Sequence, residues 1–386
     1  MKQGWEIKKL GEIGKVSMCK RVFKEDTTTD GDIPFYKIGT FGKSPDAYIT
    51  KVRYNEFRSK FSFPKKGDIL ISASGTIGRR VRYDGEPAYF QDSNIVWIDN
   101  NEKLVLNDYL YRFYEICNWG ASKGATISRL YNDNLKQIEI PYPKSLPEQQ
   151  RIISILDEAF AAIAKAKANA EQNLKNAKEL FESYLQGVFE NGNWETKTLN
   201  EISENLDSKR VPITKNVRNE GSIPYYGASG IVDYVADYLF DEDLLCVSED
   251  GANLLARTYP IAFSISGKTW VNNHAHVLRF KNMVSQKFVE LYLNSIKLDD
   301  FVSGMAQPKL NQTMLNKIPI PFPSLKEQES VVNRLDALSA ETKKLQTIYQ
   351  TKINDLEELK KSVLQKAFSG ELTSTGSVTN KQAVTV

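Results

Sequence analysis

The chain contains the same pattern of residues twice, and this repeat limits the folds that it can adopt. Four blocks recur in the same order, and the last of them continues without a gap at a constant spacing of 179 residues, the distance from Ser145 to Ser324. The blocks are Trp5–Ile13 with Trp194–Ile202, Ile33–Tyr36 with Ile223–Tyr226, Leu135–Pro143 with Leu315–Pro323, and Ser145–Phe189 with Ser324–Phe368. Self-similarity of this extent predicts a duplicated architecture. A length of 386 residues also fits two domains better than one.

Each repeat begins with a strand-rich part and ends with a helical part. Short apolar runs such as Asp68–Ser72 and Asn94–Ile98 are bounded by Gly, Pro and Asp, which predicts strands. Shorter helices are expected at 107–117 and 286–296. The segments that follow each Pro-rich junction contain no Pro and almost no Gly, which predicts one long helix in each.

We therefore expect an α+β fold with two strand-rich globular domains, each followed by a long helix. The expected segments are a first domain at 1–144, its helix at 145–192, a second domain at 193–323, its helix at 324–370 and a disordered tail at 371–386.

Apolar residues recur in the two helical segments at alternating spacings of four and three. This period is typical of a coiled-coil seam. The alternative interpretation is two ordinary core helices. At 1.5 Å per residue a helix of about 42 residues is roughly 60 Å long, which is long for a core helix. We expect the two helices to pair as an antiparallel coiled coil with pseudo-two-fold symmetry. The residues expected to pair them are Ile152, Leu156, Ala159, Ile163, Ala166, Ala170, Leu335, Leu338, Leu345, Tyr349, Leu356 and Leu359.

The middle of the first seam is rich in alanine, and the second seam carries large side chains there. Antiparallel pairing about positions 168 and 347 sets Ala159 near Leu356 and Asn173 beside Thr342. Small side chains opposite large ones would fill this seam.

No residue pattern in the chain indicates catalysis or a metal site. The three cysteines, Cys19, Cys117 and Cys246, form no C-x-x-C pair and fit a reducing compartment. His274 and His276 are the only histidines, too few for a Cys/His zinc site. The segment Ala262–Thr269 resembles a phosphate loop, but the residues after it predict a strand where a phosphate loop needs a helix. We expect no catalytic residue, metal or cofactor on this chain.

The hydropathy pattern predicts a protein that does not enter a membrane. The chain has no run of 18 apolar residues, and its first residues lack the apolar stretch of a signal peptide. We therefore expect a cytoplasmic location.

The first domain has a basic surface that suits DNA. Residues 1–147 contain 24 Lys and Arg against 18 Asp and Glu. In the loop 74–82, two glycines let the backbone approach a ligand and three arginines can neutralise phosphates or read guanine, although a solvated turn is the alternative. The candidate DNA-binding residues are Lys20, Arg21, Gly75, Thr76, Gly78, Arg79, Arg80, Arg82, Lys123 and Arg129.

The second domain is not basic, so its DNA candidates are mainly polar side chains. Residues 194–325 contain 13 Lys and Arg against 15 Asp and Glu. Asn and Gln suit adenine, although each is also an ordinary loop residue. The candidates are Lys209, Arg210, Asn272, Asn273, His274, His276, Gln307 and Lys309.

Three motifs in the first repeat carry a resemblance to a known family. They are Trp5–Ile13, Gly67–Gly78, and Ile138–Pro143 leading to Glu148–Ile152. With the order of the parts, they make residues 4–372 resemble the DNA-specificity (S) subunits of type I restriction–modification enzymes. The second repeat has Glu242–Gly251 in place of the Ser-Gly-Thr-Ile-Gly loop of the first.

The resemblance implies a subunit that catalyses nothing and selects a bipartite DNA sequence. Its two globular parts would be target-recognition domains, and because they differ in sequence the target would be asymmetric. The implied partners are double-stranded DNA, two methyltransferase subunits and restriction subunits that translocate DNA. S-adenosylmethionine, ATP and Mg would bind those partner subunits. Two alternatives from other classes stay open: a coiled-coil scaffold without a DNA role, and an enzyme with an unrecognised site.

Overall fold

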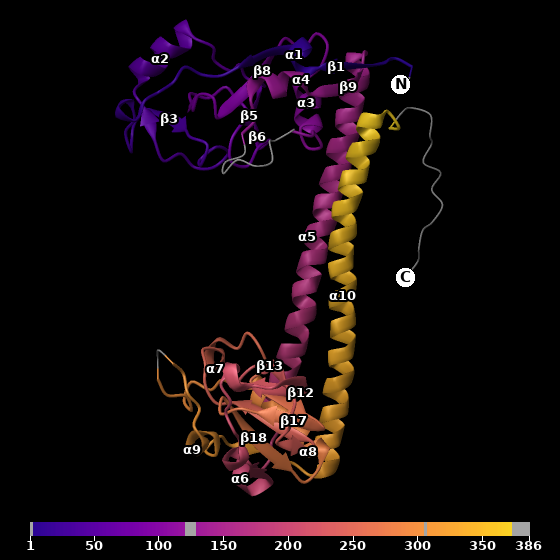
Figure 1. Cartoon of the computed structure of the whole chain (residues 1–386). Coiled ribbons are helices and arrows are strands. Elements are labelled where there is room, and N and C mark those ends of the chain that lie inside the picture. Colours follow the sequence, from indigo (N-terminus) through magenta and orange to yellow (C-terminus); the bar gives the residue numbers. More distant parts are fainter. Residues whose placement is uncertain (1–2, 120–128, 305–306, 373–386) are drawn as a thin grey trace. The chain divides into compact units, whose positions relative to one another are not determined.

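The chain builds two strand-rich domains, each followed along the sequence by one long helix (Figure 1), which confirms the predicted α+β fold. The computed structural model describes residues 3–119, 129–304 and 307–372. The long helices are α5 (Leu146–Asn191) and α10 (Leu325–Ser369). The tail expected to be disordered lies outside the described residues from 373 onward.

The long helices contribute to two compact units that do not follow the chain order. One unit combines residues 1–169 with 352–386, and the other contains residues 170–351. Each unit therefore holds one strand-rich domain and a part of both long helices.

Three small sheets build the domain of the first unit. Their strand orders are β2-β8-β5-β6, β4-β3-β7 and β1-β9. The strands are β1 (Trp5–Lys9), β2 (Gly14–Ser17), β3 (Ile33–Tyr36), β4 (Tyr48–Ile49), β5 (Ile69–Ser72), β6 (Arg80–Arg82), β7 (Tyr89–Phe90), β8 (Ile95–Asn100) and β9 (Glu139–Pro143). The helices are α1 (Leu10–Ile13), the 3-10 turn η1 (Lys24–Asp26), α2 (Lys51–Lys60), α3 (Asn107–Phe113) and α4 (Asn132–Gln137).

The domain of the second unit repeats this plan. Its sheets have the orders β11-β18-β15-β16, β13-β12-β17-β14 and β10-β19. The strands are β10 (Thr196–Lys197), β11 (Ser203–Asn205), β12 (Glu220–Gly227), β13 (Gly230–Val235), β14 (Phe240–Asp241), β15 (Leu244–Ser248), β16 (Ala262–Ile265), β17 (Lys268–Val271), β18 (Ala275–Phe280) and β19 (Ile320–Pro321). The helices are α6 (Leu199–Ile202), η2 (Asp207–Lys209), η3 (Lys215–Val217), α7 (Asn253–Ala256), α8 (Met283–Ser295) and α9 (Gln312–Leu315).

The repeated sequence blocks form equivalent strands in the two domains. The block with Ile-Pro followed by an aromatic residue and Tyr builds β3 and β12, and each pairs in parallel with a later strand, β7 or β17. The continuous apolar runs become β5 and β15, whose residues are all buried. Strands covered on both faces have this unbroken apolar pattern.

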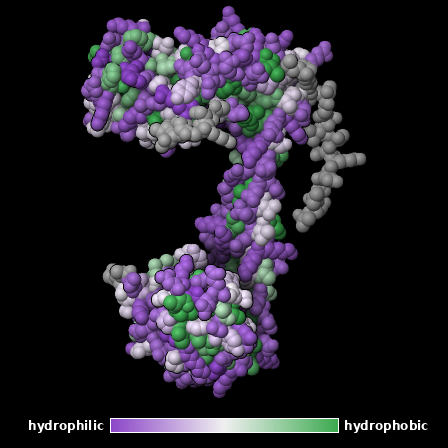
Figure 2. Space-filling view, viewed as in Figure 1, coloured by the Kyte–Doolittle hydropathy of each residue, from purple (hydrophilic) through white to green (hydrophobic). Residues whose placement is uncertain are grey.

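In each unit, parts of α5 and α10 pack against each other in antiparallel directions. In the first unit, Ile152 and Leu156 of α5 share a core with Leu364, Ala367 and Phe368 of α10. In the second unit, Leu185 and Phe189 of α5 share a core with Val332 and Leu335 of α10. The exposed faces of the long helices are largely hydrophilic (Figure 2), as expected of helices that bury one side only.

The buried positions do not keep the predicted heptad. The less exposed residues recur every 11 positions, as Ile152, Ile163, Leu174 and Leu185 in α5 and as Val331, Thr342, Ile353 and Leu364 in α10. An α-helix has 3.6 residues per turn, which lies between the 3.5 of a heptad and the 3.67 of an 11-residue repeat, and here the buried face follows the longer period. Two predicted pairing residues, Leu345 and Leu359, are therefore 36% and 48% exposed, while the other ten are buried or half-buried.

The predicted register between the helices is wrong. In the first unit, Lys360 lies over the ring of Phe160, 4.9 Å from its centre, and Lys167 pairs with Glu357. The predicted register, with Ala159 near Leu356, would place Asp355 opposite Phe160 instead. Asn173 is exposed and Thr342 donates to the Leu338 carbonyl of its own helix, 2.9 Å away. Alanine content does not determine this register, because the end of α10 is held in the core of the first domain.

A buried glutamine fixes the start of each long helix to the domain before it. Gln149 donates to the carbonyls of Leu104 and Pro143 at 2.8 and 2.9 Å and accepts from the Leu106 amide. Its equivalent, Gln328, donates to the Pro323 carbonyl at 2.8 Å and accepts from the Ser285 hydroxyl at 2.7 Å. Buried amides need such partners, which explains this residue type at both positions.

Candidate nucleic-acid interface

The predicted DNA loop of the first domain is a tight turn between β5 and β6. Ser72 donates to the Thr76 carbonyl at 2.6 Å and accepts from the Arg79 amide at 2.8 Å, so one hydroxyl closes the loop. Gly75 and Thr76 are exposed. Gly78 has φ +82°, and a Cβ there would lie 2.2 Å from the indole nitrogen of Trp119, so this position requires glycine.

The three arginines of this loop have different environments, which corrects their prediction as one DNA-binding group. Arg79 donates to the Phe41 carbonyl at 2.9 Å. Arg80 pairs with Glu115 at 2.5 Å, and its side chain is only 19% exposed. Arg82 pairs with Asp108 at 2.6 Å, but its side chain is 49% exposed. Of the three, Arg82 presents the most accessible charge to a ligand.

Glu115 connects the loop to two helices, and the sequence analysis did not identify it. Its carboxylate receives Arg80 from β6, Arg112 from α3 at 2.9 Å and Lys360 from α10 at 3.3 Å. Arg112 also pairs with Asp157 of α5. The spacing of three residues between Arg112, in α3, and Glu115, in the turn after α3, was the only local signal for this cluster.

Among the remaining first-domain candidates, the three that the structure describes are exposed. Lys20 lies 5.1 Å from the centre of the Phe61 ring, and Arg21 pairs with Asp92 at 2.9 Å. Arg129 is exposed and its backbone forms a bridge with Ser74, beside the loop. Lys123 lies outside the described residues.

A pocket of about 310 Å³ adjoins Arg82 and was not predicted from the sequence. The half-buried Tyr36 and the exposed Lys43 line it, whereas the rings of Phe41 and Phe90, which also border it, are 1% and 4% exposed. Aromatic faces with nearby cations are suitable for contact with a nucleobase.

The second-domain candidates divide into exposed and buried residues. Lys209, Asn273, His274, Gln307 and Lys309 are exposed. Arg210, Asn272 and His276 are not available for direct readout, which corrects their prediction as DNA readers. Asn272 is 6% exposed and accepts from the His274 amide, so its side chain closes the turn before β18.

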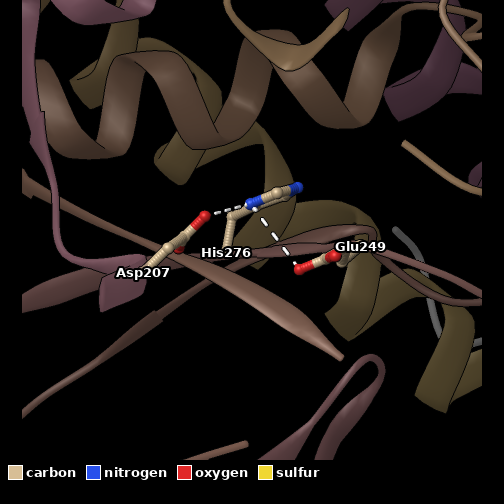
Figure 3. A group of neighbouring side chains, drawn as sticks. All are labelled: Asp207, Glu249 and His276. Carbon is tan, nitrogen blue, oxygen red and sulfur yellow. Dashed lines mark hydrogen bonds and ion pairs between the residues drawn. The ribbon is translucent and has the colours of Figure 1, made fainter. Parts of the chain in front are cut away.

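His276 and Arg210 belong to a buried ionic network, of which Figure 3 shows His276, Asp207 and Glu249. His276 Nδ1 lies 2.5 Å from Asp207 and 3.9 Å from Glu249. Arg210 binds Glu249 at 2.7 Å and approaches Asp207 at 3.5 Å, and Lys309 reaches Glu249 at 3.2 Å. Burial alone would raise the pKa of Asp207 and of Glu249, but the hydrogen bonds from His276 and Arg210 outweigh it, and both pKa values lie below their ordinary range.

The donor atoms of Asp207, Glu249 and His276 lie within 4.8 Å of one another, a spacing that a metal ion could bridge. Arg210 and Lys309 already supply the positive charge at this place. The Arg210 guanidinium, 2.7 Å from Glu249 and 3.5 Å from Asp207, and the Lys309 ammonium, 3.2 Å from Glu249, would repel a metal cation placed between the same carboxylates. The cluster therefore fits an ion-pair network and does not fit a metal centre.

Acid should remove the stabilisation that Asp207 provides. Its pKa is lowered in the folded protein, so its contribution is present above pH of about 4 and is lost as the pH falls through the folded value. We expect Asp207→Asn to lower the free energy of unfolding by about 2 kcal/mol at pH 7, with a smaller difference in acid, below the lowered pKa of Asp207. Urea unfolding across this range measures it. The exposed Asp237→Asn is the control, and an Asp207→Asn effect that persists unchanged in acid would contradict the assignment.

The cysteines have no reactive environment. All three are free, and burial raises the pKa of the Cys19 and Cys117 thiols to about 12. In the described part of the chain, no helix is both long and apolar enough to cross a membrane.

The chain matches a family model over most of its length. The model describes the type I restriction modification DNA specificity domain and matches twice, at residues 2–175 and 191–357. These two matches correspond to the two repeats.

Characterised relatives and solved structures agree with this match. The chain is 35% identical to the type I restriction enzyme EcoDI specificity subunit of Escherichia coli over 421 residues, which covers 96% of this chain and 89% of the relative. It is 64% identical to the putative type I restriction enzyme specificity subunit S.HindORF215P of Haemophilus influenzae over 153 residues, a match that covers 40% of each chain. Its fold resembles a chain from a structural study of the assembly of the type I R-M system, with a TM-score of 0.75 at 16% identity, covering 96% of this chain and 99% of that one. It also resembles the HsdS subunit from Thermoanaerobacter tengcongensis, with a TM-score of 0.63 at 18% identity over 96% and 98% of the two chains.

The resemblance stated from the motifs is confirmed. The chain belongs to the family of type I restriction–modification DNA specificity subunits, the non-catalytic subunits that recognise the DNA target of these enzymes.

Proposed function

We propose that the chain selects an asymmetric, two-part DNA sequence and holds the other subunits of a type I restriction–modification complex. Residues 1–144 and 193–323 would be the two target-recognition domains, each reading one part of the target. The long helices would hold two methyltransferase subunits, which restriction subunits join. The methyltransferase subunits would bind S-adenosylmethionine, and the restriction subunits would use ATP and Mg.

The observation that carries the proposal is the duplicated strand order with different exposed side chains. Both domains contain a four-stranded sheet of equivalent order and a parallel strand pair at the repeated Ile-Pro block. The first presents Lys20, Thr76 and Arg82, whereas the second presents Asn273, Gln307 and Lys309. Two domains with one fold and different contact groups suit two different half-sites.

Mapping the methylated adenines in DNA modified by the complex tests this proposal. The complex of this chain with its methyltransferase subunits should methylate one asymmetric bipartite sequence. Replacing residues 193–323 by the corresponding segment of another specificity subunit should change one half of that sequence and leave the other half unchanged. A target that is unaffected by this exchange, or an absence of salt-sensitive DNA binding by the complex, would favour a scaffold without a DNA role.

The exposed charge of Arg82 should contribute one phosphate contact. We expect Arg82→Ala in the assembled complex to reduce the slope of log affinity against log salt by about one unit, because one fewer counterion is released. Titration of a labelled duplex at several salt concentrations measures the slope. Lys103→Ala, an exposed cation of the same domain outside the candidate set, is the control. An Arg82→Ala slope equal to that of the parent would show that the loop is a solvated turn.

A further inference from the structure

His276 lies on β18 with only 1% of its surface exposed, and both of its ring nitrogens face oxygen acceptors. Figure 3 shows the side that faces Asp207 and Glu249. Nε2 is 2.8 Å from the backbone carbonyl of Leu310. A carbonyl oxygen can only accept a hydrogen bond, so Nε2 carries a proton.

The second nitrogen also carries a proton. Nδ1 is 2.5 Å from Oδ2 of Asp207, whose other oxygen accepts from the Val277 amide at 2.8 Å. Arg210 approaches the same carboxylate, so Asp207 is held in its ionised, acceptor-only form. A neutral imidazole of either tautomer would place a lone pair against one of these oxygens. The geometry therefore requires an imidazolium ion.

The two hydrogen bonds of His276 join two segments that are far apart in the sequence. One is the turn at 207–210, which presents Lys209, and the other is residues 307–310, which present Gln307 and Lys309. The second segment is also tied to the end of β15, because Leu310 donates to the Glu249 carbonyl at 2.8 Å and Gly251 donates to the Pro308 carbonyl at 3.0 Å. His276 closes the remaining side of this arrangement.

Charged groups surround the His276 ring, so the loss of a ring proton would change the energy of the contacts that the ring makes. Asp207 and Lys209 lie on η2 with Arg210 directly after it, Glu249 and Asp250 follow β15, His274 precedes β18, and Lys309 comes from the segment 307–310. Loss of the Nδ1 proton would leave the Asp207 carboxylate without its shortest partner inside the domain. This loss would weaken the contact between the turn 207–210 and residues 307–310.

We propose that doubly protonated His276 is a positioning residue for the DNA contacts of the second domain. It holds the turn 207–210 and residues 307–310 so that Lys209, Gln307 and Lys309 meet the same stretch of DNA. This inference rests on the proposed function, since it takes the second domain to contact DNA. His276 itself would touch no base.

The spectra use His274→Gln as the background, because this exposed substitution leaves His276 as the only histidine of the chain. The affinities are compared with and without this substitution, because His274 is itself a DNA-binding candidate. Nitrogen-15 spectra of the full-length chain should show both ring nitrogens of His276 protonated under the conditions in which the complex binds DNA most tightly. A bare ring nitrogen there would overturn the proposal. This measurement needs no substitution at His276 and so does not depend on the folding of such a variant.

The functional arm uses the complex with its methyltransferase subunits and a duplex carrying the target found by methylation mapping. As the pH rises, affinity for this duplex should fall about tenfold over the range in which the His276 ring loses a proton, a change equivalent to about 1.4 kcal/mol. Adding His276→Gln, which cannot donate to both oxygens, should give the weaker affinity at every pH.

The outcomes separate the two proposals. Affinity that stays constant while the ring loses its proton would overturn the positioning role and leave the proposed function intact. A complex without specific DNA binding at any pH would overturn the proposed function, whatever the ring spectra show.

Discussion

Replacing Phe368 by alanine is expected to lower the free energy of unfolding of the first unit by about 3 to 5 kcal/mol. Phe368 stands near the end of α10 and is 5% exposed. Its ring centre lies 5.0 Å from that of Tyr109 and 5.6 Å from that of Phe113, both on α3. Removing this ring leaves a cavity where the long helix meets the domain, and the surrounding helices can close it only in part.

Denaturant unfolding of the full-length chain measures this effect. Hydrogen exchange in α3 and α10 then shows whether the loss of stability lies in these helices. Leu359→Ala is the matched control, because this side chain lies on the same helix but is 48% exposed, and we expect it to change stability by less than about 0.5 kcal/mol. Equal effects of the two substitutions would show that α10 does not complete the first core.

The second unit contains the equivalent aromatic contact, as the sequence repeat implies. Phe189, which corresponds to Phe368, packs with ring centres 5.3 Å from Phe288 and 5.2 Å from Tyr292 of α8. Each unit therefore takes the end of one long helix and the beginning of the other into its core. Neither strand-rich domain completes its core from its own segment of the sequence alone.

The architecture could be predicted because its signals are local or repeated. Apolar runs bounded by turn residues located β5 and β8, and the absence of Pro and Gly located the two long helices. The repeat then implied that the second domain has the same fold as the first. The prediction of the residues that pair the long helices failed where a small error accumulates. The difference between 3.5 and 3.6 residues per turn moves Leu345 and Leu359 out of the contact over several turns.

The candidate interface was predicted less well because the role of a charged side chain depends on partners far away in the sequence. Arg80 has the same local context as Arg82, yet Glu115 holds the first, while the second stays half-exposed. His276 lies in β18 and is buried, whereas His274 lies in the turn just before that strand and is exposed. The sequence shows the two histidines close together, but not where the strand begins or which of them is buried.

Replacing Glu115 by glutamine is expected to destabilise the first unit by about 3 kcal/mol. The Glu115 side chain is 9% exposed and receives three cations, from Arg80, Arg112 and Lys360. Glutamine keeps the shape but removes the charge that balances them. Arg112 retains Asp157, whereas Arg80, whose side chain is 19% exposed, loses the one anionic partner found for it among the described residues.

Urea unfolding at low and high salt tests this expectation, with Glu358→Gln as the control because that carboxylate is 79% exposed and 3.7 Å from Lys361. The loss should persist in salt, since buried charges are screened much less than exposed ones. A loss that disappears at high salt would show that Glu115 acts only as a surface ion pair. A persistent loss would mean that β6, α3 and α10 depend on one carboxylate. The candidate DNA loop would then be held directly on the helix that completes the core of its domain.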